Sequence, residues 1–380
     1  MARASGPCGT GASACQLRSS RHDTVKLVDL ADFDYQLPEE LIAQEPPADR
    51  AGARMLALHR REQRWEDRRF RDFPGFLGPG DCLALNDSRV FPARLYGRRA
   101  GVRSLPVGKN NPKRLEHLSG RVEVFLLRPT GDRQWEALVR PGRKMRLRER
   151  IEFEGGLAGE IVGRGELGLR TIRFDAGADL FAEFERIGHI PLPPYIKRPD
   201  QPADRERYQT VFAREKGSAA APTAGLHFTP EILDACRARG AETAYLTLHV
   251  GLGTFQPLRA EQVETARLHA ESYSMDEENA GKLRAAKRVV AVGTTSVRTI
   301  ESVLRDGEWR ARSGETDIFI YPGFKFRGVD AMLTNFHLPR TSLLLLVCAF
   351  AGKDLALAAY RHAVEERYRF YSYGDCMLIV

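Results

Sequence analysis

The sequence has few cysteines, and their positions fit neither a metal site nor a set of disulfides. No two of them form a CxxC pair, and none stands at metal-ligand spacing from a histidine. The six cysteines of the 380-residue chain are Cys8, Cys15, Cys82, Cys236, Cys348 and Cys376. This spacing argues against a zinc centre and against a disulfide framework. We therefore expect no metal and a cytoplasmic location, where thiols stay reduced.

Long apolar runs are also lacking. The longest, LLLLVCAFA at 343–351, has nine residues, whereas a helix needs about 20 to span a bilayer. The run therefore predicts a buried core helix, and we expect no membrane partner. Residues 1–26 are rich in Ser, Ala, Gly and Arg but lack the apolar core of a secretory signal. We expect them to form a disordered N-terminal extension.

Charge is unevenly spread along the chain. The net charge is +8, yet residues 98–150 hold 15 Lys/Arg against 5 Asp/Glu, a balance of +10, so the remainder sums to −2. A local surplus of this size is a candidate footprint for a nucleic-acid backbone. It is equally compatible with a solvated, Arg-rich surface. Part of it falls in 100–120, which lacks periodicity and is typical of a polar loop insertion.

The chain divides into regions with two different sequence patterns. From 55 to 174, short runs with alternating apolar and polar residues are separated by Gly, Pro and Asp, which predicts a small antiparallel β-barrel. Segments 27–54 and 175–380 carry helix signals or alternate strands with helices, which is typical of an α/β layered domain. We therefore predict a mixed α/β protein whose larger catalytic domain, 27–54 plus 175–380, has the 55–174 barrel inserted in it.

A strand that runs directly into a helix is the first candidate site. In VVAVGTTSVRTIES, at 289–302, Gly293 is followed by Thr294, Thr295 and Ser296, and Arg298 comes one turn later. Ligands of open α/β sheets bind at the carboxyl ends of strands, and a helix N-terminus attracts carboxylates and phosphates. These four residues predict an anion site. The alternative is an ordinary hydroxyl cap on a core helix, and no P-loop motif is present.

A glycine-rich loop follows another strand. TLHVGLGTFQPL, at 247–258, places Gly251 and Gly253 where a methyltransferase or dinucleotide-binding protein has its glycine loop. The third glycine is missing, and Pro257 stands where a helix would have to begin. What remains is a flexible loop with His249 at the strand end, and a lone histidine there is more often structural.

The uncharged stretch SAAAPTAGLHFT, at 218–229, combines Gly225 with His227. Glycine lets the backbone approach a ligand closely. Thr229 and Pro230 predict a helix start directly after it, and Gly240 predicts the end of that helix. A histidine two residues before a helix N-terminus should have a lowered pKa and stay neutral, as a base requires.

Three further stretches carry candidate contacts. Their chemistry suits anions or stacked bases, although a stiff proline-rich linker, barrel alternation or a core would produce the same patterns. They are IGHIPLPPYIKRP at 187–199 with Tyr195, Lys197 and Arg198, LNDSRVFPARLYGRR at 85–99 with Asn86, Arg89 and Arg94, and LTNFHLPRTS at 333–342 with His337.

Taken together, ten segments are more specific than any one of them. They are FDYQLPEELIAQ, LNDSRVFPARLYG, GHIPLPPYIKRPD, RYQTVFA, GSAAAPTAGLHFT, TLHVGLGTFQP, VGTTSVRTIES, TDIFIYPGF, TNFHLPRTSLLLLVCAFAG and YRFYSYGDCMLI. In order and spacing, from about residue 27 to 380, the chain resembles the S-adenosylmethionine:tRNA ribosyltransferase-isomerases of queuosine synthesis.

The resemblance implies a fold and a reaction. The fold is an α/β domain with a small inserted barrel. The reaction transfers the ribosyl part of S-adenosylmethionine onto 7-aminomethyl-7-deazaguanine at the wobble position of tRNA and isomerises it, giving epoxyqueuosine with release of adenine and methionine. S-adenosylmethionine is then a consumed substrate, tRNA carrying the deazaguanine precursor is the partner, no cofactor or metal is used, and a monomer is implied.

The chemistry of that reaction suggests duties for the residues named above. A proton must leave the carbon beside the sulfonium, for which His227, His249 and His337 are unranked candidates. Predicted substrate contacts are Thr294, Thr295, Ser296, Arg298, Tyr195, Gly225, Gly251 and Gly253. Predicted tRNA contacts are Asn86, Arg89, Arg94, Lys197 and Arg198. The rival functions are an S-adenosylmethionine-dependent RNA methyltransferase and a non-enzymatic RNA-binding protein.

Overall fold

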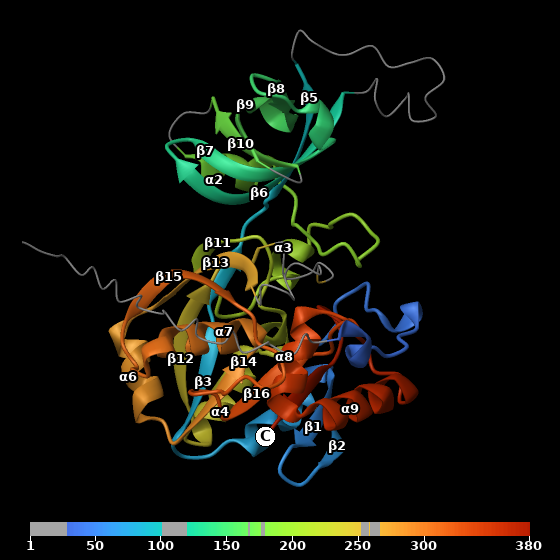
Figure 1. Ribbon diagram of the computed structural model, residues 1–380, viewed down its shortest axis with the longest axis vertical. Helices are drawn as coiled ribbons and strands as arrows, with labels where there is room; N and C mark the ends of the chain where they lie inside the picture. The colour runs from blue at the N-terminus through green and yellow to red at the C-terminus, as the bar shows by residue number, and fades with distance from the viewer. Residues whose placement is uncertain (1–28, 101–119, 166–167, 176–178, 252–257, 259–266) are drawn as a thin grey trace, which may run out of the picture.

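Two β-structures organise the chain in the computed structural model, which describes residues 29–100, 120–165, 168–175, 179–251, 258 and 267–380 (Figure 1). A large sheet domain fills one end of the long axis, and a small barrel stands at the other. The predicted fold class is therefore confirmed. The predicted extension at 1–26 and nearly all of the predicted insertion at 100–120 lie outside the described residues.

The large sheet has nine strands in the order β15-β13-β12-β3-β14-β16-β17-β1-β2. Its centre, β12-β3-β14-β16, is parallel, and the flanks contain antiparallel pairs. In chain order the strands are β1 (Arg54–His59), β2 (Arg64–Arg69), β3 (Asp81–Asn86), β12 (Glu242–Leu248), β13 (Arg267–Met275), β14 (Arg288–Val292), β15 (Arg312–Ile318), β16 (Ala331–Asn335) and β17 (Cys376–Ile379). Because β14 and β16 are parallel neighbours, their carboxyl ends meet at one edge.

Helices cover both faces of this sheet. One apolar core packs under α6, α7, α8 and α9, and a second packs under α4 and the 3₁₀ helix η4. The bounds are η4 (Phe70–Phe76), α4 (Pro230–Ala238), α6 (Glu277–Ala285), α7 (Thr294–Val303), α8 (Ser342–Ala351) and α9 (Lys353–Glu365). Apolar burial on each face, at roughly 25 cal/mol per Å², stabilises the three layers.

The barrel is closed by antiparallel pairs in the order β10-β7-β6-β5-β8-β9. Its strands are β5 (Arg94–Arg99), β6 (Arg121–Gly131), β7 (Gln134–Arg140), β8 (Arg150–Phe153), β9 (Ala158–Arg164) and β10 (Leu169–Phe174). Helix α2 (Leu180–Ile187) adds Phe184 to the barrel core. Closure leaves the strands no free edge.

The predicted barrel boundary at residue 55 is wrong. Strands β1, β2 and β3 alternate or run apolar like barrel strands, but they belong to the large sheet. The reason is long-range pairing, because β1 lies between β17 and β2, and β3 lies between β12 and β14. Strand periodicity reports a buried face and carries no information on the partner strand.

Local helix signals were read more successfully. Thr229 caps α4 by accepting a hydrogen bond from the Ile232 N–H at 3.3 Å, and Gly240 follows with φ +84°. The apolar run at 342–351 forms α8, capped by Thr341. Segment 27–54, which carries helix signals, forms short 3₁₀ turns in its described part, including η2 (Glu39–Leu41).

Among the described residues, no single helix is long and apolar enough to cross a membrane. Helices α8 and α9 pass that test together by length and composition, but they bend by 116° where they meet.

Candidate functional site

A pocket opens at the carboxyl ends of β14 and β16, where an α/β sheet is expected to bind ligands. It encloses about 620 Å³, part of which is open to solvent. Its lining combines hydroxyl, aromatic and apolar side chains and includes no Asp, Glu, Lys or Arg among the described residues. The lining residues are Tyr195, Ala221, Pro222, Thr223, Ala224, Val250, Gly293, Thr294, Thr295, Thr334, Asn335, His337, Leu338, Thr341, Leu343, Tyr371 and Ser372.

The N-terminus of α7 forms one wall of this pocket. Gly293 precedes the helix with φ +90°, a conformation that favours glycine, and gives it no side-chain cap. Thr294 and Thr295 line the pocket, and the buried Thr295 hydroxyl has no hydrogen-bond partner in the described part of the chain. Ser296 lies outside the lining, because its hydroxyl donates back to the Val292 carbonyl at 2.8 Å.

Arg298, predicted to receive a carboxylate, lies outside the pocket lining. Its side chain is 3% exposed and forms an ion pair with Glu271 of β13. The Glu271 carboxylate also accepts a hydrogen bond from the Gly251 N–H at 2.8 Å. A buried cation needs a paired anion, so in this structure Arg298 joins α7 to β13.

His227 lies behind the pocket and is joined to it through Asn335. The Thr223 hydroxyl donates to Asn335 Oδ1 at 3.0 Å, and Asn335 Nδ2 donates to His227 Nε2 at 3.2 Å. Accepting that bond requires an unprotonated Nε2. Burial, with the charges of Arg50 and Arg369, lowers the His227 pKa to about 4. His227 is therefore neutral at pH 7, as predicted. The main cause of its lowered pKa is burial, whereas the prediction rested on the helix dipole.

His337 is the predicted histidine that lines the pocket itself. Its Nε2 lies 2.8 Å from the Thr334 hydroxyl, and its main-chain N–H donates to the Tyr360 hydroxyl at 3.1 Å. Burial lowers the His337 pKa to about 3. The side chain is therefore a neutral hydrogen-bonding group at physiological pH.

His249 and the glycine loop have a different setting. The His249 ring packs against Gly217, where an added Cβ would lie 3.1 Å from the ring, and burial lowers its pKa. His249 and Gly251 are absent from the pocket lining, although their neighbour Val250 belongs to it. Gly253 lies outside the described residues.

Two closely packed tyrosines, which we call the tyrosine wall, also line the pocket. The rings of Tyr195 and Tyr371 lie 4.0 Å apart between centroids at an interplanar angle of 36°. The Tyr195 hydroxyl lies 2.5 Å from the Ser372 hydroxyl, and burial raises the Tyr195 pKa well above its usual value. Tyr371 has φ +73°, a strained conformation for a bulky residue.

Gly225 was predicted to admit a ligand, but it serves packing. An added Cβ would lie 2.7 Å from Thr210 Cγ2 and 2.9 Å from Phe212 Cζ. The residues of the same stretch that line the pocket are Ala221, Pro222, Thr223 and Ala224.

Three of the predicted tRNA contacts are bonded internally. Asn86 is 1% exposed and bridges the backbone of Leu248 and Ser88. Arg94 forms an ion pair with Glu123 at 3.2 Å and donates to the Leu192 carbonyl. A polar residue type does not reveal whether its partner is solvent, ligand or main chain, so the sequence did not show these internal bonds.

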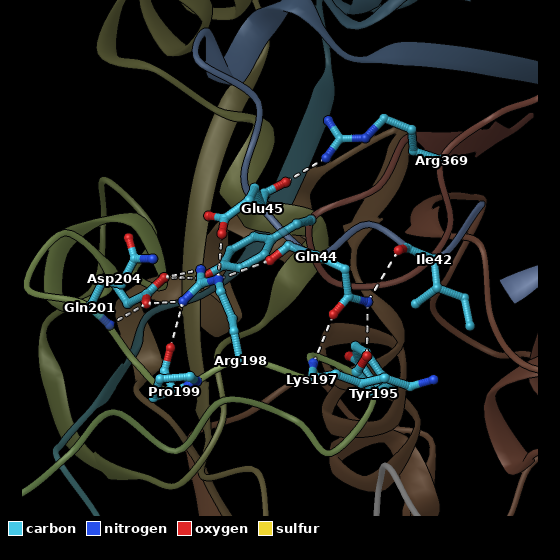
Figure 2. Close-up of polar contacts among 11 residues, drawn as sticks. Ile42, Gln44, Glu45, Tyr195, Lys197, Arg198, Pro199, Gln201, Asp204 and Arg369 are labelled. Carbon is cyan, nitrogen blue, oxygen red and sulfur yellow. Dashed lines mark hydrogen bonds and ion pairs between the residues drawn. The ribbon is translucent and has the colours of Figure 1, made fainter. Parts of the chain in front are cut away.

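Arg198 is the third, and Figure 2 shows its guanidinium surrounded by acceptors. It donates two hydrogen bonds to Asp204, at 2.7 and 2.9 Å, and pairs with Glu45 at 2.7 Å. The Asp204 bonds raise the Arg198 pKa above its usual value. The proline-rich loop is thereby tied to the segment before β1, with Gln44 bonded to the Tyr195 carbonyl at 2.9 Å.

The other two predicted tRNA contacts are exposed. Lys197 forms an exposed ion pair with Glu39 at 2.8 Å, a kind of pair worth about 0–1 kcal/mol. Arg89 lies on β4 (Ser88–Val90), which pairs with β11 (Glu215–Ser218), and is exposed. Both stay predictions.

Sequence reasoning missed much of the polar lining. Thr223, Thr334, Asn335, Tyr371 and Ser372 were not named as contacts, although they meet in the pocket. The available signal was the position of Thr334 and Asn335 at the end of a buried strand, the same rule that singled out Thr294. Within the described ranges, no three His, Cys, Asp or Glu side chains are grouped to hold a metal ion.

Comparison with known proteins shows the family. Residues 30–379 match a family model described as queuosine biosynthesis protein. The S-adenosylmethionine:tRNA ribosyltransferase-isomerases of Solibacter usitatus and Symbiobacterium thermophilum are 70% and 50% identical, covering 93% and 92% of this chain and 100% and 99% of theirs. The crystal structure of S-adenosylmethionine tRNA ribosyltransferase from Thermotoga maritima matches with a TM-score of 0.51 and 38% identity over 92% of this chain and all of its own. The chain therefore belongs to the queuosine biosynthesis protein family of S-adenosylmethionine:tRNA ribosyltransferase-isomerases.

Proposed function

We propose that the chain transfers the ribosyl part of S-adenosylmethionine onto 7-aminomethyl-7-deazaguanine at the wobble position of tRNA and isomerises it to epoxyqueuosine. Family membership supports the reaction. We place the reaction in the pocket at the ends of β14 and β16, which Tyr195 and Tyr371 also line. This pocket offers a helix N-terminus for an anion and aromatic rings for a purine within one lining.

The methionine carboxylate is proposed to bind at the start of α7. Unpaired N–H groups and the positive end of the helix dipole favour a carboxylate there. The Thr295 hydroxyl is buried in the lining without a partner, and a ligand oxygen would satisfy it. The adenine or deazaguanine ring is proposed to pack against Tyr195 and Tyr371, since offset aromatic stacking is favourable and tolerant of the base.

Proton transfer is proposed for His337, the histidine in the lining. Its neutral imidazole can accept a proton or a hydrogen bond, and Thr334 holds the ring orientation. His227 is proposed as a positioning residue that acts through Asn335. S-adenosylmethionine is a consumed substrate, and we propose no metal or cofactor, a monomer and a cytoplasmic location.

The deciding experiment incubates the protein with S-adenosylmethionine and tRNA bearing the deazaguanine precursor, then analyses nucleosides and small products. Free adenine, free methionine and an epoxyqueuosine nucleoside are expected. S-adenosylhomocysteine would instead identify a methyltransferase, and tRNA binding without consumption of S-adenosylmethionine would identify a non-enzymatic binding protein. Sedimentation of the purified chain tests the monomer.

A further inference from the structure

The far end of the barrel carries cations that the pocket does not use. Arg128, on β6, reaches Glu315 of the large sheet at 2.9 Å, so that end of the barrel faces the large domain. Strand β7 starts beside it and runs the opposite way, ending at Arg140. Figure 1 shows the barrel extending from the large domain along the long axis.

Six cations gather at this far end, on the end of β7, the turn after it and the end of β9. We call this cluster the distal rim: Arg140, Arg143, Lys144, Arg146, Arg148 and Arg164. Five are exposed, and Lys144 is partly exposed. Within the described residues, none of the six side chains has a hydrogen bond or an ion pair, unlike most arginines of the large domain.

Two described acids that lie close to the rim in sequence or register are already engaged, whereas Glu166, two residues after Arg164, lies outside the described residues. Glu149, next to Arg148, is buried and accepts two hydrogen bonds from Arg99, at 2.9 and 3.0 Å. Glu123 lies opposite Arg140 in the ladder and pairs with Arg94. The positive charge of the distal rim therefore has no carboxylate to neutralise it within the described chain.

The distal rim is also concave and held in shape. Arg140, Arg143, Arg164 and Arg170 line a depression of about 830 Å³ that is open to solvent. Arg170 is buried and donates to the carbonyls of Met145, at 2.7 Å, and Leu169, at 2.6 Å. Arg170, which also lines the depression, thus joins the turn after β7 to the start of β10.

An exposed leucine lies within the cluster. Leu147, between Arg146 and Arg148, is 58% exposed and is one of two large hydrophobic side chains so exposed among the described residues. Arg148 has φ +66°, an uncommon conformation for arginine. A cationic rim with one apolar contact suits a ribose–phosphate backbone, where charge provides the affinity and an apolar side chain packs on a sugar or base.

We propose that the distal rim binds the phosphate backbone of the same tRNA whose wobble base enters the pocket. This inference rests on the proposed function, since it needs a tRNA in the large domain. Phosphate contacts position a nucleic acid without reading its sequence. The rim therefore acts on tRNA affinity and its dependence on salt, and it has no part in the chemical step.

The test compares two triple variants of the full chain. The first is Arg143→Gln, Arg146→Gln and Arg164→Gln in the rim. The control is Arg61→Gln, Arg239→Gln and Arg361→Gln, which removes the same charge from exposed arginines of the large domain that have no ion pair in the described chain. Thermal unfolding of both should match the parent, because surface substitutions usually change stability by about 0.5 kcal/mol or less.

The rim variant should raise the KM for tRNA roughly tenfold or more and reduce the slope of log KM against log salt by about 2–3. Its kcat at saturating tRNA and its KM for S-adenosylmethionine should equal those of the control. A rim variant with the control's KM for tRNA would overturn the inference while adenine release by the parent still supports the proposed function. The parent and the rim variant are also tested for binding to phosphatidylserine vesicles. If the parent binds the vesicles and the rim variant does not, while the KM for tRNA is unchanged, the rim would be assigned to a membrane instead.

Discussion

The pocket and the distal rim differ in whether their charged side chains have partners. The described pocket lining has no formally charged side chain, and nearby cations such as Arg298 and Arg198 are paired with carboxylates. The rim leaves its cations without partners. Charge without a partner acts over about a Debye length and attracts a polyanion. Neutral polar groups act at contact distance, where orientation decides a reaction. We therefore expect the rim to capture tRNA and the pocket to carry out the chemistry.

The largest expected effect is on the neutral side of this comparison. His337→Gln keeps a hydrogen-bonding amide near Thr334 but cannot take up a proton, so kcat should fall by about 10²–10⁴-fold. The salt dependence of KM for tRNA should stay that of the parent. Single-turnover adenine release measures it, and the same change at His227 and His249 ranks the three. A greater loss at His249 would contradict the assignment.

Arg298 tests whether buried charge near the pocket is structural. Arg298→Met leaves Glu271 without its ion-pair partner and should destabilise the fold by about 3–5 kcal/mol. Adding Glu271→Gln should recover most of that stability in urea unfolding. Recovery of KM for S-adenosylmethionine together with stability would mean that Arg298 holds no substrate. Recovery of stability alone would restore the predicted carboxylate contact.

Acid should lower the free energy of unfolding through the buried histidines near the pocket. It should leave the charge of the rim unchanged, since arginine stays protonated. His227 and His337 have folded pKa values of about 4 and about 3, against about 6.5 when unfolded. Above pH 6.5 neither state takes up a proton. As the pH falls below 6.5 the unfolded chain gains protons first, so stability falls by about 1.4 kcal/mol per unit for each histidine until its folded pKa is reached.

Urea unfolding between pH 7 and 4 measures that loss, which for His227 amounts to about 3 kcal/mol. His227→Asn should show a shallower dependence on pH over the same range. An identical slope would mean that the His227 imidazole is not held neutral by burial.

The smallest effect concerns the unpartnered hydroxyl of the lining. Thr295→Val removes a buried group without a hydrogen bond and should stabilise the free protein by about 1–2 kcal/mol. The KM for S-adenosylmethionine should rise, because a ligand oxygen would lose its partner, and KM for tRNA should not change. Thermal unfolding with steady-state kinetics measures both, and a Val variant with unchanged KM would remove Thr295 from the binding site.

What the sequence predicted correctly was local or family-wide. Thr229, Pro230 and Gly240 defined α4, because caps depend on neighbouring residues. The strand-to-helix junction at Thr294 was found by a rule that holds for α/β sheets in general. The internal bonds of Asn86 and Arg198 were not predicted, since their partners include Leu248 and Glu45, which lie far away in sequence. Asn335 was overlooked because its role depends on Thr223 and His227, more than 100 residues away.

The position of β17 in the sequence determines when the large sheet can be completed during synthesis. Residues Cys376–Ile379 lie between β16 and β1, and β1 with β2 joins the sheet through β17 alone. At a synthesis rate of about 5–20 residues per second, β17 is synthesised tens of seconds after β1, which pairs with it. The barrel, continuous in sequence, is complete long before. A ribosome that stops a few codons early would therefore release a finished barrel on an unfinished sheet.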